Sequence, residues 1–365
     1  MRTVRKNRRI AVFVSAHGFG HAARACAVMA SIHRADPGMR FEIYTNAPQW
    51  FFSDSLGDAF GFHCLRTDIG MVQLSPFRTD TRATLHDLKR FLPFNRDQIE
   101  KTARDIKAMA CRLVICDIAP MGIAVAHKAG IPSVLIENFT WDWIYRGYPP
   151  TSVAFDTYIE YLAAYFKKAS YHIQTEPICN PSDTDLRTGP AARKTRKTAT
   201  VVRRELGIGP RSKMIMLTFG GVPDNGDYVA AAQKAKNVHF IIPGNFHNKR
   251  SRANITFLPY RSEFFHPDLV NASDAIIGKA GYSTIAEVYH AGKPYGYISR
   301  PDSRESPVLT RFIEKHLAGI PVTNAELKNG TWTAKVPVLL DMPPRDKPPS
   351  NGADEIAAFI LNIAQ

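Results

Sequence analysis

The stretch that most constrains the fold lies late in the chain, at residues 275–294, and reads AIIGKAGYSTIAEVYHAGKP. A short apolar run leads into Gly278 and Gly281, which free the backbone to turn sharply and to come close to a ligand. Ser283 or Thr284 is then expected to cap a helix. Because a helix start carries unpaired N–H groups and a partial positive charge, the stretch predicts a strand, a turn and a helix that hold a phosphate.

The N-terminal half shows the same pattern. Residues 9–15 are an apolar run, residues 16–21 a glycine turn and residues 22–33 an alanine-rich helix, followed by a second apolar run at residues 41–45. This order is one parallel unit of an α/β sheet, in which ligand loops follow the carboxyl ends of the strands. Since the second half repeats the plan, we expect an α/β fold with two Rossmann-like domains whose glycine turns face each other across a cleft.

A chain of 365 residues favours two domains over one. We expect the N-terminal domain at residues 1–176 and the C-terminal domain at residues 201–345. Residues 177–200 are polar, basic and contain proline, so they are interpreted as a linker. Residues 346–365 are expected to end in a helix that can pack back on the N-terminal domain.

Charge limits the choice of partners. Lys and Arg number 47 against 33 Asp and Glu, a net charge of +14, which favours nucleotide diphosphates, acidic lipid surfaces or nucleic acid. The basic runs at residues 2–9 and 187–204 contain no interleaved aromatic residues and no RNA module, so no nucleic-acid partner is expected. Peripheral contact with an acidic membrane surface stays a hypothesis.

Cysteine usage and hydropathy bear on the compartment. The five cysteines are scattered without metal-ligand spacing and are interpreted as reduced thiols. No apolar run reaches membrane-spanning length, and the basic N-terminus leads into a strand rather than the continuous apolar stretch of a signal peptide. We therefore expect a cytoplasmic protein.

Residues 82–109 are long, amphipathic and interrupted by Pro93. The pattern predicts a pair of helices that cover the sheet. The alternative is a membrane-surface or acceptor-binding face.

Several motifs resemble those of the two-domain glycosyltransferases with the GT-B fold. Residues 18–21, GFGH, match the N-terminal glycine turn of that superfamily, as in the bacterial transferase that adds N-acetylglucosamine to the peptidoglycan lipid precursor. Residues 278–284, with Glu287 and residues 292–294, match its C-terminal nucleotide motif. Including residues 138–142, NFTWD, the chain is most similar to the glycosyltransferase-like region of L-arabinokinases. No glycine–serine ATP loop is present, so arabinokinase activity is not implied.

The resemblance implies a glycosyltransferase that uses a nucleotide sugar, expected to be UDP-linked, as a substrate and needs no cofactor. No Asp-x-Asp pair follows a strand, which fits independence of metal. By this resemblance Glu287 binds the ribose and Glu305 lies close to the donor sugar. The expected donor-binding residues are Gly18, Gly20, Gly220, Gly221, Gly278, Lys279, Ala280, Gly281, Tyr282, Ser283, Thr284, Glu287 and Glu305.

Transfer to a hydroxyl group needs a base. His21 leads because it follows the glycine turn at the carboxyl end of the first strand, and imidazole changes its charge near neutral pH. His17 is a second candidate, and Asp117 is expected to orient the histidine or to bind acceptor hydroxyls.

The acceptor is expected on the N-terminal domain, beside the run that follows the strand ending at Ile136. Trp141 and Trp143 can stack on a sugar ring there, because an aromatic face suits the apolar face of a pyranose. The expected acceptor-binding residues are Asn138, Trp141 and Asp142.

Three other functions stay open. A UDP-sugar epimerase of the same fold would convert the donor without an acceptor. A non-catalytic nucleotide-sugar sensor or regulatory protein would bind without turnover. A nucleic-acid binder would show strongly salt-dependent RNA affinity that Glu287→Ala leaves unchanged.

Overall fold

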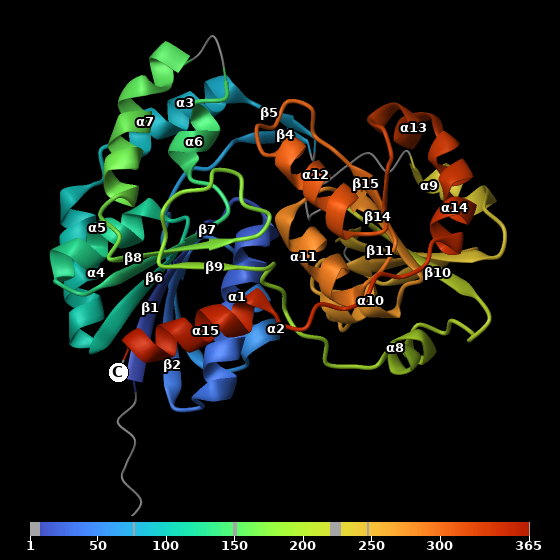
Figure 1. The fold of residues 1–365 in the computed structure, drawn as a ribbon, viewed down its shortest axis with the longest axis horizontal. Helices are drawn as coiled ribbons and strands as arrows, with labels where there is room; N and C mark the ends of the chain where they lie inside the picture. Colours follow the sequence, from blue (N-terminus) through green and yellow to red (C-terminus); the bar gives the residue numbers. More distant parts are fainter. Residues whose placement is uncertain (1–7, 76, 149–151, 220–227, 247, 365) are drawn as a thin grey trace, which may run out of the picture. The chain divides into compact units, whose positions relative to one another are not determined.

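The computed structural model describes residues 8–75, 77–148, 152–219, 228–246 and 248–364. The chain forms two compact units (Figure 1). The first comprises residues 1–74, 79–193 and 350–365, and the second comprises residues 75–78 and 194–349. Each unit is built around a seven-stranded sheet with helices on both faces, which confirms the α/β class.

The sheet of the first unit is parallel throughout its described pairings. Its buried strands are runs of Ile, Val, Leu and Phe, as expected for strands covered on both faces. In spatial order the strands are β3 Phe60–Cys64, β2 Met39–Thr45, β1 Arg8–Val14, β6 Cys111–Asp117, β7 Ser133–Glu137, β8 Tyr171–Thr175 and β9 Leu186–Thr188. A separate two-stranded ladder joins β4 Gln73–Ser75 and β5 Arg78–Thr79.

One face of this sheet is covered by α1 Phe19–Ala35, α2 Gln49–Leu56 and α15 Gly352–Ile363. The last of these helices lies along α1, where Ser31 donates a hydrogen bond to Asp354 over 2.8 Å. The remaining helices of the unit are α3 Thr81–Phe91, α4 Arg96–Ala108, α5 Pro120–Ala129, α6 Trp141–Tyr145 and α7 Ser152–Phe166. Of these, α4 and α7 pack against α5, and α3 and α6 pack against α7.

The predicted helical pair at residues 82–109 is confirmed as α3 and α4, with Pro93 in the turn between them. Side chains of Asp80 and Asn95 cap the two helices by accepting hydrogen bonds from backbone N–H groups. The range 177–200, predicted as a linker, instead contains β9 and the first residues of α8 Ala199–Glu205. Polar composition hid this strand because β9 is only three residues long and pairs at the edge of the sheet.

The second unit repeats the plan, with one antiparallel edge strand. In spatial order its strands are β12 Arg250–Arg252, β13 Ile255–Pro259, β11 Val238–Phe246, β10 Lys213–Thr218, β14 Ala275–Lys279, β15 Tyr295–Ile298 and β16 Gly319–Pro321. One face packs against α8, α10 His266–Ala272, α11 Tyr282–Ala291 and α12 Ser306–His316. The other packs against α9 Tyr228–Lys234, α13 Asn324–Asn329, the 3-10 helix η1 Thr331–Ala334 and α14 Lys335–Asp341.

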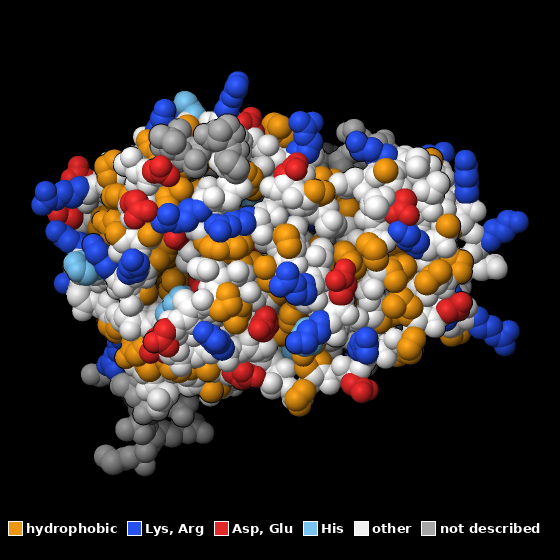
Figure 2. Space-filling view, turned by 45° about the horizontal axis from the view of Figure 1, so that its top comes forward, with side chains coloured by type: hydrophobic (Ala, Val, Ile, Leu, Met, Phe, Trp, Pro, Cys, Tyr) orange, Lys and Arg blue, Asp and Glu red, His pale blue; other side chains and the backbone are white. Residues whose placement is uncertain are grey.

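Surface charge is dispersed over the face shown in Figure 2, where Lys and Arg side chains stand singly or in small groups with acidic side chains among them. On that face the excess of positive charge does not form one continuous basic patch. Among the described helices, none is both long and apolar enough to cross a bilayer.

Candidate active site

A buried histidine stands where β1 turns into α1. Gly18 has φ 71°, in the left-handed region that favours glycine, and the helix begins at the next residue. This turn puts His21 in the first turn of α1, with its side chain 10% exposed. Its Nδ1 lies 3.0 Å from Asp117 Oδ1, whereas Nε2 has no hydrogen-bond partner among the described residues. The expected pairing of Asp117 with the histidine is therefore present.

The carboxylate of Asp117 is shared with a second, fully buried side chain. Arg24 donates from Nε to Asp117 Oδ2 over 2.8 Å and from Nη2 to Oδ1 over 2.6 Å. Burial raises the pKa of Asp117, but the Arg24 charge and the hydrogen bonds from His21 and Arg24 outweigh it, so the pKa lies below its usual range. Asp117 is consequently a carboxylate at neutral pH.

Backbone strain marks the same place. Ile118, directly after Asp117, has φ 42°, which is a rare conformation for a β-branched residue. Its N–H donates to Ile136 O over 3.2 Å, so the neighbouring strand β7 holds the strained turn. Strained residues of this kind collect at functional sites, where the surrounding structure enforces them.

Asn138 does not face an acceptor. It is 0% exposed, and its Oδ1 accepts a hydrogen bond from Arg24 Nη1 over 3.0 Å. Its buried Nδ2 has no hydrogen-bond partner among the residues that the structure describes. The prediction of direct acceptor binding is corrected here, because the side chain is directed into the buried ion pair instead.

Trp141 is also buried, at 2% exposure, and its Nε1 donates to Asp68 Oδ2 over 2.7 Å. Its ring packs on His17, His21 and Tyr145. The predicted stacking of Trp141 on a sugar is therefore wrong for this conformation, because neighbouring rings and not solvent cover its faces. Trp141 packs the histidine in place.

Asp68 is a buried acid that the sequence did not single out. Burial raises its pKa to about 6, and hydrogen bonds from Ser15 and Trp141 and the nearby His21 offset part of that rise. The carboxyl group therefore titrates close to neutral pH, beside the candidate base.

The other two predicted residues of this region differ in setting. His17 is partly buried, and its Nδ1 accepts a hydrogen bond from Met71 N over 3.3 Å, so this nitrogen is occupied in ordering the loop. Asp142, in the first turn of α6, has a buried Oδ1 that finds no hydrogen-bond partner in the described residues. Burial raises the pKa of Asp142.

The nucleotide motif in the second unit forms the predicted strand and helix, β14 and α11. The glycine argument needs correction: Gly278 sits within β14, where a Cβ atom would lie 2.1 Å from Thr218 O on β10. Its role is close packing of two strands. Gly281 is the N-cap residue with φ −124°, and no side chain caps the helix, so the predicted cap by Ser283 or Thr284 is wrong.

The first turn of α11 nevertheless offers donors. The first intrahelical hydrogen bond runs from Ile285 N to Gly281 O, over 3.0 Å. The N–H groups before Ile285 in the first turn therefore donate no hydrogen bond within the helix. Ser283 and Thr284 hydroxyls have no hydrogen-bond partner among the described residues. Ala280 is excluded from the predicted backbone contacts, because its N–H donates to Ile298 O over 2.9 Å.

Glu287 lies on the second turn of α11. It is 5% exposed, and its Oε2 is 2.6 Å from His266 Nδ1. The other ring nitrogen of His266 lies 3.4 Å from Thr218 Oγ1, at the end of β10. The elements β10, α10 and α11 thus contribute Thr218, His266 and Glu287 to one chain of polar contacts. Of these three residues, only Glu287 was predicted.

A cationic group borders the same strand end. Burial lowers the pKa of Lys279 to about 7; the Arg300 charge lowers it further, and Glu305 acts in the opposite direction. Arg300 and Glu305 form an ion pair, and the Arg300 Nε has no hydrogen-bond partner within the described part of the chain. Lys279 and Glu305 therefore belong to one electrostatic cluster.

Of the other predicted donor residues, Gly220 and Gly221 lie outside the described residues, and Gly20 is in the first turn of α1.

Arg24, Asp68, His266 and Arg300 were missed by the sequence interpretation. Arg24 alone left a usable signal: it is a charged residue three positions after His21 in an alanine-rich helix, so both share one face. A charge on an apolar helix needs a buried partner.

Comparison with known proteins gives one family. Residues 8–336 match the family described as glycosyl transferase family 1. The chain is 27% identical to an L-arabinokinase of Arabidopsis thaliana over 361 residues, covering 96% of this chain and 34% of that protein. It is 25% identical over 224 residues to the UDP-N-acetylglucosamine–N-acetylmuramyl-(pentapeptide) pyrophosphoryl-undecaprenol N-acetylglucosamine transferase of Bacillus pumilus, covering 56% of this chain and 57% of that protein. The chain thus spans 34% and 57% of these two relatives.

Solved structures agree on the fold. A UDP-glucosyltransferase from Polygonum tinctorium, capable of glucosylating indoxyl, is similar with a TM-score of 0.63 at 12% identity, covering 99% of each chain. The fold of this chain is that of the GT-B glycosyltransferases.

Proposed function

Because the chain belongs to glycosyl transferase family 1, we propose that it transfers a sugar from a UDP-linked nucleotide sugar to a hydroxyl group of an acceptor. The observation that carries the proposal is the His21–Asp117 pair, in which one ring nitrogen is held and the other is left without a partner. Two similar proteins, the Bacillus pumilus and Polygonum tinctorium transferases, are named for UDP-linked sugars, which supports the choice of nucleotide.

The first unit would supply the base. A histidine that donates Nδ1–H to a carboxylate keeps a lone pair on Nε2. In the transfer, Nε2 takes the proton of the acceptor hydroxyl and the hydroxyl oxygen forms a bond to the anomeric carbon. The bond between that carbon and the diphosphate oxygen breaks, and its electron pair leaves with the UDP. Asp117, already ionised, stabilises the imidazolium that results.

The second unit would hold the donor. The first-turn N–H groups of α11 and the Ser283 and Thr284 hydroxyls suit the diphosphate. Glu287 suits the ribose hydroxyls, with His266 fixing its carboxylate. Lys279 and Arg300 would offset the charge of the leaving diphosphate, so that we expect transfer without an added metal ion.

A thermal-shift panel of nucleotide diphosphates and nucleotide sugars tests the donor half. A ligand that binds only the folded chain at 100 times its Kd adds about 2.7 kcal/mol of stability. We expect UDP and UDP-sugars to raise the melting temperature more than the matching guanosine and adenosine compounds, and to do so after treatment with EDTA. No shift with any nucleotide would refute the proposal.

Two substitutions separate the roles. Glu287→Ala is expected to weaken UDP-sugar binding far more than His21→Ala, and Glu287→Gln, which keeps an oxygen for His266, controls for local packing. His21→Ala should retain donor binding and lose transfer by roughly 10²- to 10⁴-fold, the usual contribution of a positioned base. Equal losses of binding in a calorimetric titration would contradict this division. Donor conversion without an acceptor would identify an epimerase, and binding without turnover a sensor.

A further inference from the structure

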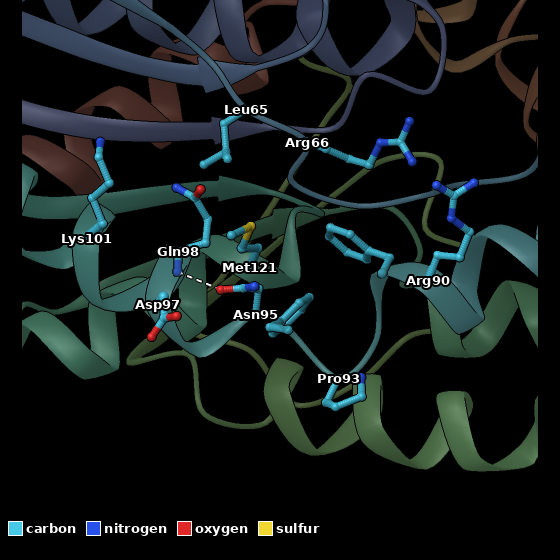
Figure 3. Close-up of a pocket in the computed structure, with 11 residues that line it drawn as sticks. Leu65, Arg66, Arg90, Pro93, Asn95, Asp97, Gln98, Lys101 and Met121 are labelled. Carbon is cyan, nitrogen blue, oxygen red and sulfur yellow. Dashed lines mark hydrogen bonds between the residues drawn. The ribbon is translucent and has the colours of Figure 1, made fainter.

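A pocket of about 560 Å³ opens in the first unit between the end of β3, the α3–α4 turn and the start of α5 (Figure 3). This volume lies within the range of sites that enclose small organic ligands. None of the residues named above as donor, base or acceptor groups lines it.

The inner wall of the pocket is apolar. Met121 at the start of α5 is 3% exposed, and Phe94 in the α3–α4 turn is 8% exposed. Phe91 packs edge-on against Phe94, with their ring centroids 5.4 Å apart. The turn is fixed from behind, because the Phe94 N–H donates to Tyr161 Oη of α7 over 3.1 Å. A fixed aromatic wall of this kind suits a flat apolar ligand.

The rim of the pocket is cationic. Arg66 and Arg90 are exposed, and neither has a hydrogen-bond or ion-pair partner among the described residues. Figure 3 shows both at one end of the pocket, with Lys101 and the carboxylate of Asp97 toward the other. Lys101 is engaged by Asp105 over 3.1 Å, so the two arginines are the groups left to receive an anion. Guanidinium groups bind carboxylate and phosphate through paired hydrogen bonds.

Two chain segments connect this pocket with the His21 centre. Leu65 and Arg66 line the pocket, and two residues later Asp68 accepts the hydrogen bond of Trp141, whose ring packs on His21. Met121 follows Asp117 by four residues, across the strained turn at Ile118. The Leu65–Arg66 and Met121 walls of the pocket and the candidate base therefore follow three strands of the same sheet, β3, β6 and β1.

We propose that this pocket binds the acceptor, and that the acceptor is an organic anion with a flat apolar body and a free hydroxyl group. The apolar body lies against Phe91, Phe94 and Met121, and the carboxylate or phosphate lies between Arg66 and Arg90. This inference rests on the proposed function, in which the acceptor hydroxyl loses its proton to His21 Nε2 and its oxygen replaces UDP on the anomeric carbon.

The probe is 6-hydroxy-2-naphthoate, a fluorescent hydroxy acid, compared with its neutral carboxamide in a fluorescence titration of the full chain. We expect the acid to bind at least about tenfold more tightly than the amide, because only the acid accepts charge-assisted hydrogen bonds from both arginines. Arg66→Gln with Arg90→Gln should remove that preference. Equal binding of acid and amide, or binding of neither, would overturn the proposal.

A matched variant controls for general attraction. Arg82→Gln with Arg104→Gln removes the same two charges from exposed positions of α3 and α4 outside the pocket, and should keep the preference for the acid. If this control loses as much affinity as the pocket variant, the site assignment falls. Transfer from UDP-sugars to the naphthoate, followed by mass spectrometry, should show a KM raised about tenfold in the pocket variant with kcat changed less than threefold.

The donor is measured on the same preparations. If UDP-sugars shift the melting temperature but the acid shows no arginine-dependent binding, the acceptor inference fails and the proposed function stands. If the acid binds through the arginines but no nucleotide shifts the melting temperature, the acceptor role falls together with the proposed function.

Discussion

We predict that Lys279 makes binding of the proposed UDP-sugar donor depend on pH. With a pKa of about 7 in the free protein, its side chain is half neutral at pH 7 and about 90% neutral at pH 8. A diphosphate placed against it favours the ammonium form and returns the pKa toward its ordinary value. Binding of UDP-glucose should therefore take up about 0.9 proton at pH 8 and about 0.1 at pH 6.

The pKa of Lys279 also determines how the Kd for UDP-glucose should change with pH. The cationic fraction of Lys279 falls from about 0.9 at pH 6 to about 0.03 at pH 8.5, so the Kd for UDP-glucose should rise about 30-fold across this range. The diphosphate of a sugar nucleotide is doubly esterified and has no proton to lose there. Arg300 and Glu305, the two charged groups that act on Lys279, are present in the free and bound states alike.

Calorimetric titration in two buffers of different ionisation enthalpy measures the uptake directly. Lys279→Met should bind more weakly at every pH, with no uptake attributable to this site, whereas Lys315→Met, at an exposed position on α12, should behave as the wild type. Uptake below about 0.2 proton at pH 8, or a Lys279→Met variant with the full pH dependence, would refute the reasoning.

Two further predictions concern stability of the first unit, which holds three of the four tryptophans and so dominates unfolding followed by fluorescence. The raised pKa of Asp68 means that the folded chain binds the proton more tightly than the unfolded chain, so the free energy of unfolding should fall as pH rises from about 4 to 6. Asp68→Asn should abolish that fall and raise the free energy of unfolding by up to about 3 kcal/mol at pH 7. An unchanged pH profile would contradict the assignment. Arg24→Met leaves Asp117 as an uncompensated buried charge and should lower the free energy of unfolding, measured in denaturant titrations, by about 3–5 kcal/mol. Arg24→Met combined with Asp117→Asn should lower it by less. Additive losses from the two substitutions would argue against the ion pair.

Much of the fold was predictable because its signals are local. Apolar runs followed by glycine and an alanine-rich segment specify a strand, a turn and a helix within about 20 residues, and the α/β class follows from their repetition. The strand β9 was missed because three residues at a sheet edge are too few to show such a period. The role of Gly278 was misjudged for a related reason: the backbone that it admits belongs to β10, some 60 residues earlier in the chain.

The candidate site was predictable where a residue lies at or just after the end of a strand. Asp117 and Lys279 are the last residues of β6 and β14, and His21 follows β1 in the first turn of α1. The rule that parallel strands gather ligands at their carboxyl ends selects all three. Burial is not encoded in this way. The run NFTWD looks polar and aromatic, as an open cleft would, yet Asn138 and Trp141 are directed inward by partners at distant positions, Arg24 and Asp68.

The partners that escaped prediction also change the chemistry. A carboxylate that paired with His21 alone would direct its whole charge to the imidazolium formed in the proposed transfer. Here Arg24 donates two hydrogen bonds to the same carboxylate, and its Nη2 lies 3.4 Å from His21 Nδ1. In the tautomer that carries its proton on Nδ1, this nitrogen donates to Asp117, so the guanidinium cannot also donate to it. Arg24 therefore holds Asp117 ionised and in place, and in the proposed transfer that carboxylate orients the ring so that Nε2 can accept the proton of the acceptor hydroxyl.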